Sequence, residues 1–377
     1  MGFLNCVGIF RLLYRNHILP NNTPFQLAWI FSAQRASVWA FGPLYGRLID
    51  AYGPGIGLWP LTGICVFELI AMTLTQDYWM TLSSGIMYGL AGGGLYAASW
   101  LSVGQWFSRR RGLVAGMAAC GGSLGGVIFP LFLDCMLGHA NLIASMQYTV
   151  ALLVIVSIPG IYFFRHRLPI RGWDRKATWF DLNLLRQRHY QYFVAGSFLV
   201  MWGYWAPIDF ILQSALQLFP PTFGLYLIPI MSLASIPGHI VFGYLGDRVG
   251  HYLVMSWCCL LLGASFMLIW IPSTMSQSLR GVFVFALAYG FFGGAFNSLA
   301  MPCVAKLGRP ETLGQRLGPF HFAMAISCLT GLPIMEALRT LHNGYFAMQV
   351  FATLVIILGS IFITAALDIL ANLHDQT

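Results

Sequence analysis

The stretch GYLGDRVG, Gly243 to Gly250, decides the fold together with a second stretch, GRLIDAYG, Gly46 to Gly53. In both, an aspartate follows the first glycine by four residues, and another glycine comes three residues later. The copies are offset by 197 residues, from position 46 to position 243. Each copy ends a long apolar run and precedes the next one. A repeat of about half the chain, built on apolar segments, is typical of duplicated membrane proteins.

The composition places the chain in a lipid environment. Hydrophobic residues make up 58% of the 377 residues and charged residues only 8%, whereas soluble domains carry about 25% charged residues. Water cannot solvate this much apolar surface, so a multi-pass membrane protein is predicted, with the lipid bilayer as its surroundings. The net charge of +8 does not indicate nucleic-acid binding, because the cations follow the membrane topology. The eight cysteines lie in apolar runs and are predicted to pack there.

Twelve apolar segments can be counted, six before and six after a polar centre. We predict an N-terminal six-helix bundle over 1–164, a cytoplasmic linker over 165–191 and a C-terminal six-helix bundle over 192–377. The first segment, Gly2–Tyr14, is short for a membrane crossing, which needs about 20 residues. We therefore expect either a short first helix or a gene model that starts late.

The distribution of cations predicts the orientation. With the N-terminus inside, 15 of the 20 Lys and Arg residues fall on inside loops, as the positive-inside rule requires. Both termini are therefore predicted to be cytoplasmic, and the plasma membrane is the predicted location. The basic, tryptophan-containing centre fits equally a helix on anionic headgroups or a solvated linker.

The repeated aspartates are candidates for a contact that holds one conformation. An aspartate at a helix end can pair with a cation or accept hydrogen bonds from the N-terminus of a neighbouring helix. Glycine lets two membrane helices approach closely. We predict that this conformational latch comprises Gly46, Asp50, Gly53, Gly243, Asp247, Arg248 and Gly250. Glycines at four-residue spacing in one later segment are predicted to pack helices closely: Gly112, Gly116, Gly121 and Gly125.

The two copies resemble the motif that the major facilitator superfamily carries in its second-to-third and eighth-to-ninth helix loops. The second copy fits better, since Ala51 replaces the cation of the first. More widely, residues 2–338 resemble the monocarboxylate porter branch in its fungal form. The stretches that carry this resemblance are NNTPFQLAWIFSAQ (Asn21–Gln34), FGPLYGRLIDAYGP (Phe41–Pro54), RRRGLVAG (Arg109–Gly116), SIPGHIVFGYLGDRVG (Ser235–Gly250), AYGFFGGAFNSLAMP (Ala288–Pro302) and LGQRLGPFHFAMAISCLTGLPI (Leu313–Ile334).

This resemblance implies an all-α major facilitator fold, with two six-helix bundles related by a pseudo-two-fold axis. It also exposes departures. Proton-coupled animal members carry a lysine in helix 1 and an Asp/Arg pair in helix 8, where this chain has Asn5 and then Ser235 and His239. The proton and carboxylate chemistry of those members therefore does not transfer directly.

Ionisable residues inside membrane segments are candidates for function, because lone charges in hydrocarbon are costly. Asp209 beside Pro207, His239 beside Pro237 and Arg35 are the main ones. An Arg35 or His239 cation could bind a carboxylate, and Asp209 could take a proton. The structural alternatives are that Arg35 reaches outward to the headgroups, and that ionisable residues at other positions pack or reach the interface: Glu68, Asp134 and Glu336.

Aromatic and polar residues near mid-membrane are candidates to line a cavity for an organic ligand, although packing or interface positions would also explain them: Tyr88, Tyr96, Trp100, Trp202, Tyr204, Trp205, Tyr289 and Asn297. No hydrolase, metalloprotease or phosphate-loop motif is found, and no metal-ligand spacing. We therefore predict no enzyme activity, no cofactor and no metal.

The sequence thus predicts a secondary transporter, a monomer that moves a small organic solute by alternating access. A monocarboxylate or related organic anion is the first expectation, with protons as the coupling ion. One alternative on the same fold is export of a fungal secondary metabolite or uptake of a vitamin-like compound. The other is a non-transporting sensor or a degenerate, truncated relative.

Overall fold

The computed structural model describes residues 2–53, 57–107, 110–164, 184, 186–218, 221–307, 313–341 and 344–374. Within these ranges the chain is helical and contains no strand. Large apolar side chains such as Phe67, Leu268 and Phe163 remain exposed on the outer surface, as expected where lipid replaces water.

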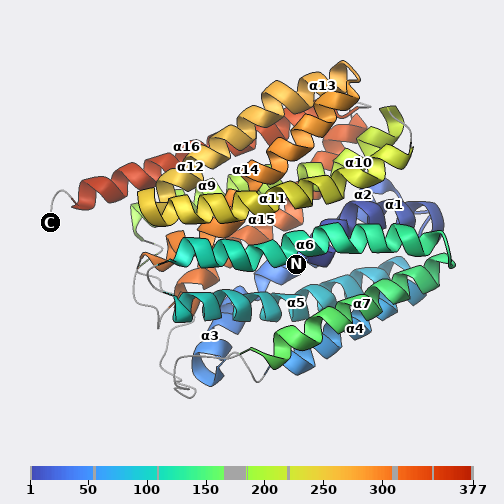
Figure 1. Cartoon of the computed structure of the whole chain (residues 1–377), viewed down its shortest axis with the longest axis horizontal. Helices are drawn as coiled ribbons and strands as arrows, with labels where there is room; N and C mark the ends of the chain where they lie inside the picture. Colours follow the sequence, from blue (N-terminus) through green and yellow to red (C-terminus); the bar gives the residue numbers. More distant parts are fainter. Residues whose placement is uncertain are drawn as a thin grey trace.

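The helices up to α7 are called the N-terminal half and those from α9 on the C-terminal half (Figure 1). The N-terminal half contains η1 (Gly2–Cys6), α1 (Val7–Leu13), η2 (Tyr14–Ile18), α2 (Pro24–Ala40), α3 (Gly42–Tyr52), α4 (Leu58–Leu74), α5 (Tyr78–Trp106), α6 (Arg111–Leu137) and α7 (Leu142–Tyr162). The C-terminal half contains α9 (Arg188–Tyr204), α10 (Ala206–Leu218), α11 (Pro221–Val249), α12 (His251–Ser265), η3 (Phe266–Trp270), α13 (Ile271–Met275), α14 (Leu279–Ala305), α15 (Leu313–Leu341) and α16 (Phe346–His374).

Eight of the described helical segments are long and apolar enough to cross a membrane, and α4 is a shorter apolar helix. The first helical segment continues to Ile18, beyond its predicted end at Tyr14. The predicted central linker lies mostly outside the described residues, and the exact limits of the two bundles remain a prediction.

Prolines and polar caps set the local geometry. The seventh apolar segment is divided at Trp205 into α9 and α10. Pro207 follows two residues later, and its backbone nitrogen has no hydrogen to donate. The helix α2 begins with a capping box, in which Thr23 and Gln26 satisfy each other's backbone N–H groups. Trp205 and Asp209 both meet Arg35 of the N-terminal half.

The sequence repeat is also a repeat of backbone geometry. Gly53 and Gly250, equivalent in the two copies, have φ of 78° and 126°, and they are the only glycines with positive φ among the described residues. Each follows the last residue of a helix, α3 in one copy and α11 in the other. A side chain is strained in this conformation, so glycine is required at both positions.

The two halves meet along two helix pairs. Helix α6 packs along α11, and α2 packs along α15; α6 and α11 lie side by side in Figure 1. A Cβ added to Gly112 would lie 2.5 Å from the carbonyl oxygen of Gly243, and one added to Gly116 would overlap the carbonyl of His239. Gly125 is equally close to the backbone of Gly2, where η1 packs on α6.

The prediction that Gly121 packs helices closely is wrong. This residue is exposed, and a Cβ added there would meet no heavy atom within 4 Å. The spacing from Gly121 to Gly125 matched a packing motif, but α6 turns this position away from its neighbours, so Gly121 does not pack helices.

The two glycines therefore make a matched test on one helix. Gly116→Val is expected to lower the free energy of unfolding by about 1–3 kcal/mol, because the added methyl groups force α6 and α11 apart. Gly121→Val should change it by less than about 0.5 kcal/mol, since the site is open. The thermal unfolding midpoint of each purified variant measures the difference. Equal midpoints for the two variants would contradict this assignment of the interface.

Candidate functional site

A cavity of about 350 Å³ lies between the two halves. Its wall combines aromatic and hydroxyl-bearing side chains with small and apolar ones, and of the described residues that line it only His239 is ionisable near neutral pH. Seven of the eight aromatic and polar residues predicted near mid-membrane line it: Tyr88, Tyr96, Trp100, Tyr204, Trp205, Tyr289 and Asn297. The eighth, Trp202, instead donates a hydrogen bond of 2.8 Å to Thr330 Oγ1.

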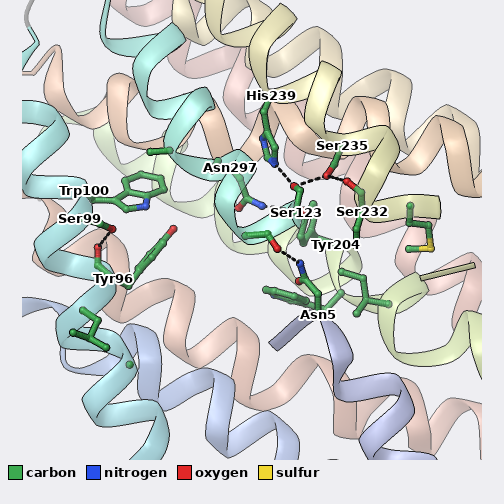
Figure 2. A pocket seen from close by; sticks show the side chains of 18 of the residues that line it. Asn5, Tyr96, Ser99, Trp100, Ser123, Tyr204, Ser232, Ser235, His239 and Asn297 are labelled. Carbon is green, nitrogen blue, oxygen red and sulfur yellow. Dashed lines mark hydrogen bonds between the residues drawn. The ribbon is translucent and has the colours of Figure 1, made fainter. Parts of the chain in front are cut away.

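Four of the six predicted substrate or proton candidates line this cavity: Asn5, Ser235, His239 and Asn297. Figure 2 shows them around one polar region. Asn5 Nδ2 donates to the carbonyl oxygen of Gly122 at 3.2 Å. Asn297 Nδ2 donates to the Tyr204 hydroxyl at 3.0 Å, and the Tyr289 hydroxyl donates to the Tyr204 carbonyl at 2.5 Å. These bonds fix the orientation of polar groups in an otherwise apolar wall.

His239 joins the halves through a chain of hydrogen bonds. Its Nδ1 lies 2.7 Å from the carbonyl oxygen of Gly294, and its Nε2 lies 3.0 Å from Ser123 Oγ, on α6 of the other half. Ser123 Oγ is 2.6 Å from Ser235 Oγ, which donates to the carbonyl of Ser232 at 2.7 Å. Sequence reasoning missed Ser123, because nothing in its own segment marks it. The histidine is bonded on both nitrogens in this conformation.

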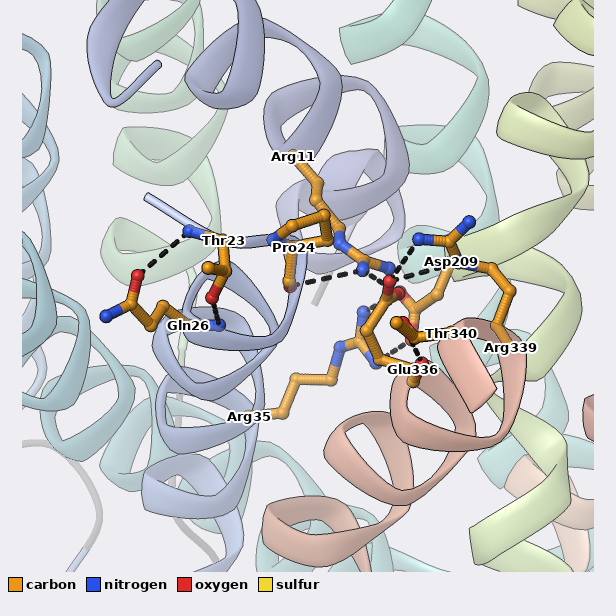
Figure 3. A network of polar contacts seen from close by, with 9 residues as sticks. All are labelled: Arg11, Thr23, Pro24, Gln26, Arg35, Asp209, Glu336, Arg339 and Thr340. Atoms are coloured by element: carbon orange, nitrogen blue, oxygen red, sulfur yellow. Dashed lines mark hydrogen bonds and ion pairs between the residues drawn. The ribbon is translucent and has the colours of Figure 1, made fainter. Parts of the chain in front are cut away.

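Arg35 and Asp209 form a buried ion pair behind the cavity wall (Figure 3). Arg35 Nη1 lies 2.6 Å from Asp209 Oδ2, and Nη2 contacts Oδ1. The residues are 1% and 0% exposed. The guanidinium carbon lies 4.6 Å from the centre of the Trp205 ring, which faces the cavity. Arg35 therefore does not reach outward to headgroups, and neither charge lines the cavity.

A second group of charges crosses the halves, with Arg11 and Glu336 buried and Arg339 half-buried. Arg11 Nη2 contacts Glu336 Oε2, and Arg339 Nε donates to Glu336 Oε1 at 3.0 Å. Glu336 is 0% exposed, so it pairs with cations inside the protein. The three-residue spacing to Arg339 could have indicated one partner. Arg11 is 325 residues away in sequence and could not have been inferred locally.

Asp247 makes the contact expected of a latch, with a helix N-terminus as its partner. Its Oδ1 accepts from the Gly112 backbone N–H and its Oδ2 from that of Leu113, both at 2.8 Å. These are free N–H groups in the first turn of α6. His251 Nε2 lies 3.0 Å from Oδ1. Arg248 is not part of this contact, because its guanidinium lies over the Tyr244 ring at 4.6 Å. The side chain of Asp50, in the other copy, lies outside the described part.

The contacts across the halves lie at two ends of the molecule. Successive long helices run in alternate directions, so Asp247, close to the end of α11, and Glu336, close to the end of α15, lie at opposite ends. The cavity lies between them, with Asp209 and Arg35 on the Glu336 side. Both ends are therefore held together across the halves in this conformation.

Comparisons with known proteins show the family. The family model described as Major Facilitator Superfamily matches residues 15–228. The chain is 32% identical to the MFS-type transporter hasB of Aspergillus fumigatus, over 96% of this chain and 84% of that protein. It is 29% identical to the aspyridones efflux protein apdF of Emericella nidulans, over 96% and 73%.

Two solved structures share the fold. The human organic anion transporter MFSD10 aligns with a TM-score of 0.69 at 16% identity, covering 96% of this chain and 97% of that one. The Escherichia coli fucose:proton symporter FucP aligns with a TM-score of 0.66 at 15% identity, covering 97% and 96%. The predicted fold class is confirmed. From the family match over more than half of its length and the relative 32% identical across nearly all of it, the chain belongs to the Major Facilitator Superfamily of membrane transporters.

Proposed function

We propose that this transporter exports an uncharged, aromatic organic metabolite through the cavity by alternating access. The observation that carries the proposal is the cavity wall, which offers aromatic rings, hydroxyls and amides and, among the described residues, no permanent charge. An uncharged aromatic molecule matches such a wall, because it loses little hydration on entry and gains apolar contact. Several relatives in fungi are named as efflux proteins for secondary metabolites, which supports the direction.

A monocarboxylate fits the same cavity less well. A carboxylate taken out of water needs a cation or several donors. Arg35 is already bonded to Asp209, and the position of the helix 1 lysine is taken by Asn5. We therefore propose that the chain is related by descent to the monocarboxylate porter branch but carries an uncharged aromatic substrate.

Alternating access would require the contacts at the two ends to open in turn. Opening at one end breaks the bonds from Asp247 to the first turn of α6. Opening at the other end separates Glu336 from Arg11 and Asp209 from Arg35. The predicted orientation places the Asp247 end in the cytoplasm. The plasma membrane and a monomeric state remain parts of this proposal.

We also propose that His239 carries a coupling proton. The chain from Gly294 through His239, Ser123 and Ser235 to Ser232 contains four contacts. With its hydrogen on Nε2, a neutral imidazole and the two hydroxyls already make the contacts from His239 through Ser123 and Ser235 to Ser232, and Nδ1 can accept from Ser298 Oγ at 2.9 Å. Protonation would replace that acceptor contact with a hydrogen bond donated from Nδ1 to Gly294.

His239→Gln is expected to flatten the pH dependence of transport, because glutamine cannot take up a proton. The rate itself need not vanish, because glutamine keeps one donor and one acceptor. The initial rate of substrate movement in proteoliposomes at a series of pH values measures this. His139→Gln is the matched control, since His139 is exposed. An unchanged pH profile in His239→Gln would remove the histidine from coupling.

Counterflow in proteoliposomes tests the function itself. Vesicles loaded with an uncharged phenol should accumulate the labelled compound faster than protein-free vesicles, and saturably. Lactate and pyruvate should show no protein-dependent counterflow. Saturable counterflow of lactate but not of the aromatic compound would overturn the proposal in favour of a monocarboxylate. Counterflow of a vitamin alone would favour the uptake alternative, and none with any compound would favour a sensor.

A further inference from the structure

A group of aromatic rings at one end of the cavity encloses a histidine that the proposed mechanism does not use. His321, on α15, is 3% exposed. Its ring centre lies 5.2 Å from that of Trp39 on α2, and 6.2 and 6.4 Å from those of Tyr96 and Trp100 on α5. Trp39, Tyr96 and Trp100 all line the cavity. One half thus provides three rings and the other half provides the imidazole.

The imidazole is incompletely bonded. The Nε2 atom of His321 is buried and has no hydrogen-bond partner in the described part of the chain. A buried nitrogen without a partner costs free energy relative to one that is bonded, and such groups in folded proteins call for a ligand, a water molecule or a functional reason. By contrast, both nitrogens of His239 are bonded.

The rings are arranged to hold a flat molecule. Trp39 and Tyr96 have centres 5.1 Å apart at an interplanar angle of 74°, and Tyr96 and Trp100 are 5.2 Å apart at 54°. A planar aromatic guest gains more from offset or edge contacts with such rings than from a direct face-to-face stack. Figure 2 shows Tyr96 and Trp100 on one side of the cavity and the His239 chain on the other.

We propose that Trp39, Tyr96, Trp100 and His321 form a subsite for one hydroxyl-bearing aromatic ring of the transported molecule. The three cavity-lining rings contact the guest ring. His321 lies behind them and does not itself line the cavity in this conformation, so its Nε2 would bond to the guest hydroxyl only when the rings part around the guest. The subsite rests on the proposed function and narrows its substrate class to phenols and similar hydroxylated aromatics. Because the subsite draws on both halves, opening at the Asp247 end would separate its parts and release the ring.

The test uses two probes of one shape, 2-naphthol and naphthalene, with the purified full chain in lipid nanodiscs. Equilibrium dialysis should give a Kd for 2-naphthol about five- to tenfold lower than for naphthalene, as expected for one buried hydrogen bond. His321→Phe keeps a ring but removes the nitrogen, so the two probes should bind equally. His321→Gln should retain most of the preference. Trp100→Leu should raise the Kd of both probes.

Controls separate the subsite from folding and from the wider proposal. His139→Phe makes the same replacement at an exposed turn and should bind as the native chain does. Each variant is accepted only if its thermal midpoint stays near the native value, and His321→Gln provides a second reading if His321→Phe fails that criterion.

A preference for 2-naphthol that survives in His321→Phe would overturn the subsite. If neither probe binds the native chain while counterflow of an aromatic compound persists, the subsite is wrong and the proposed function stands. If 2-naphthol binds more tightly than naphthalene but no aromatic compound shows counterflow, the subsite stands and the proposed function is wrong.

Discussion

Asp209→Ala is expected to destabilise the protein more than any other single change discussed above. It leaves the Arg35 guanidinium, 1% exposed, without its bidentate carboxylate partner. Removing one partner of a buried ion pair costs about 3–5 kcal/mol, because an uncompensated charge stays buried. The yield of monodisperse protein and its thermal midpoint in detergent measure the loss.

The double variant Arg35→Met/Asp209→Leu distinguishes a pairing role from an intrinsic need for charge. With both charges removed, apolar side chains of similar volume fill the site, and such replacements are often neutral or stabilising. We expect the double variant to unfold near the native midpoint while Asp209→Ala does not. Asp134→Ala, at an exposed carboxylate on α6, serves as the control. A double variant as unstable as Asp209→Ala would show that the pair does more than compensate its own charges.

The transport activity of the double variant is a separate measurement. If the pair must separate as the Glu336 end opens, its removal should favour open states at that end and change the rate. A native rate in a stable double variant would exclude Arg35 and Asp209 from the transport cycle and leave them a role in packing only.

Asp247→Ala is expected to open the other end. The carboxylate accepts two backbone hydrogen bonds at 2.8 Å from the first turn of α6. A hydrogen bond to a charged group contributes about 1.5–3 kcal/mol, and 1.4 kcal/mol corresponds to a tenfold shift between two states. Loss of both bonds should therefore raise the population that is open at this end by at least about tenfold, without preventing folding.

Native cysteines on α6 report this opening. Cys120 is half-buried, with its Sγ 3.7 Å from the carbonyl oxygen of Ile236 on α11, so it lies at the interface that would open. Labelling of Cys120 by a membrane-impermeant maleimide, added to sealed vesicles on either side in turn, should be at least about tenfold faster in Asp247→Ala. Faster labelling from the cytoplasmic side alone would also support the predicted orientation.

Cys135 provides the internal control. It is exposed near the other end of the same helix, so its labelling rate should not respond to Asp247. Each cysteine is followed in a background where the other is serine. An unchanged Cys120 rate in Asp247→Ala, with Cys135 also unchanged, would contradict a role for the aspartate in closing this end.

The structure shows where most of the predicted latch and candidate residues lie, but it does not test their roles. Gly53 and Gly250 carry the backbone geometry that the repeat implies, and Gly112 and Gly243 meet across the halves. The prediction that Gly121 packs helices was wrong because a four-residue spacing identifies one face of a helix but does not specify what that face contacts. The side chain of Asp50 lies outside the description, so its part in the latch stays a prediction.

The sequence by itself determined the helical membrane class, the duplication and the family resemblance at superfamily level. These follow from composition, hydropathy and glycine positions, which act through local backbone preferences and the cost of exposing backbone polar groups to lipid. The same local information identified Asp209, Arg35 and His239 as unusual, because each is a costly group in an apolar segment.

Only the tertiary structure decided what those groups do with one another. Arg35 and Asp209 are 174 residues apart, Arg11 and Glu336 are 325 apart, and His239 meets Ser123 from the other half. No periodicity in one segment specifies which residue of a distant segment it will face. Those pairings arise when two separately patterned halves pack, because the low dielectric makes an unpaired buried charge costly, so the buried Arg35 and Arg11 are stable only beside a carboxylate.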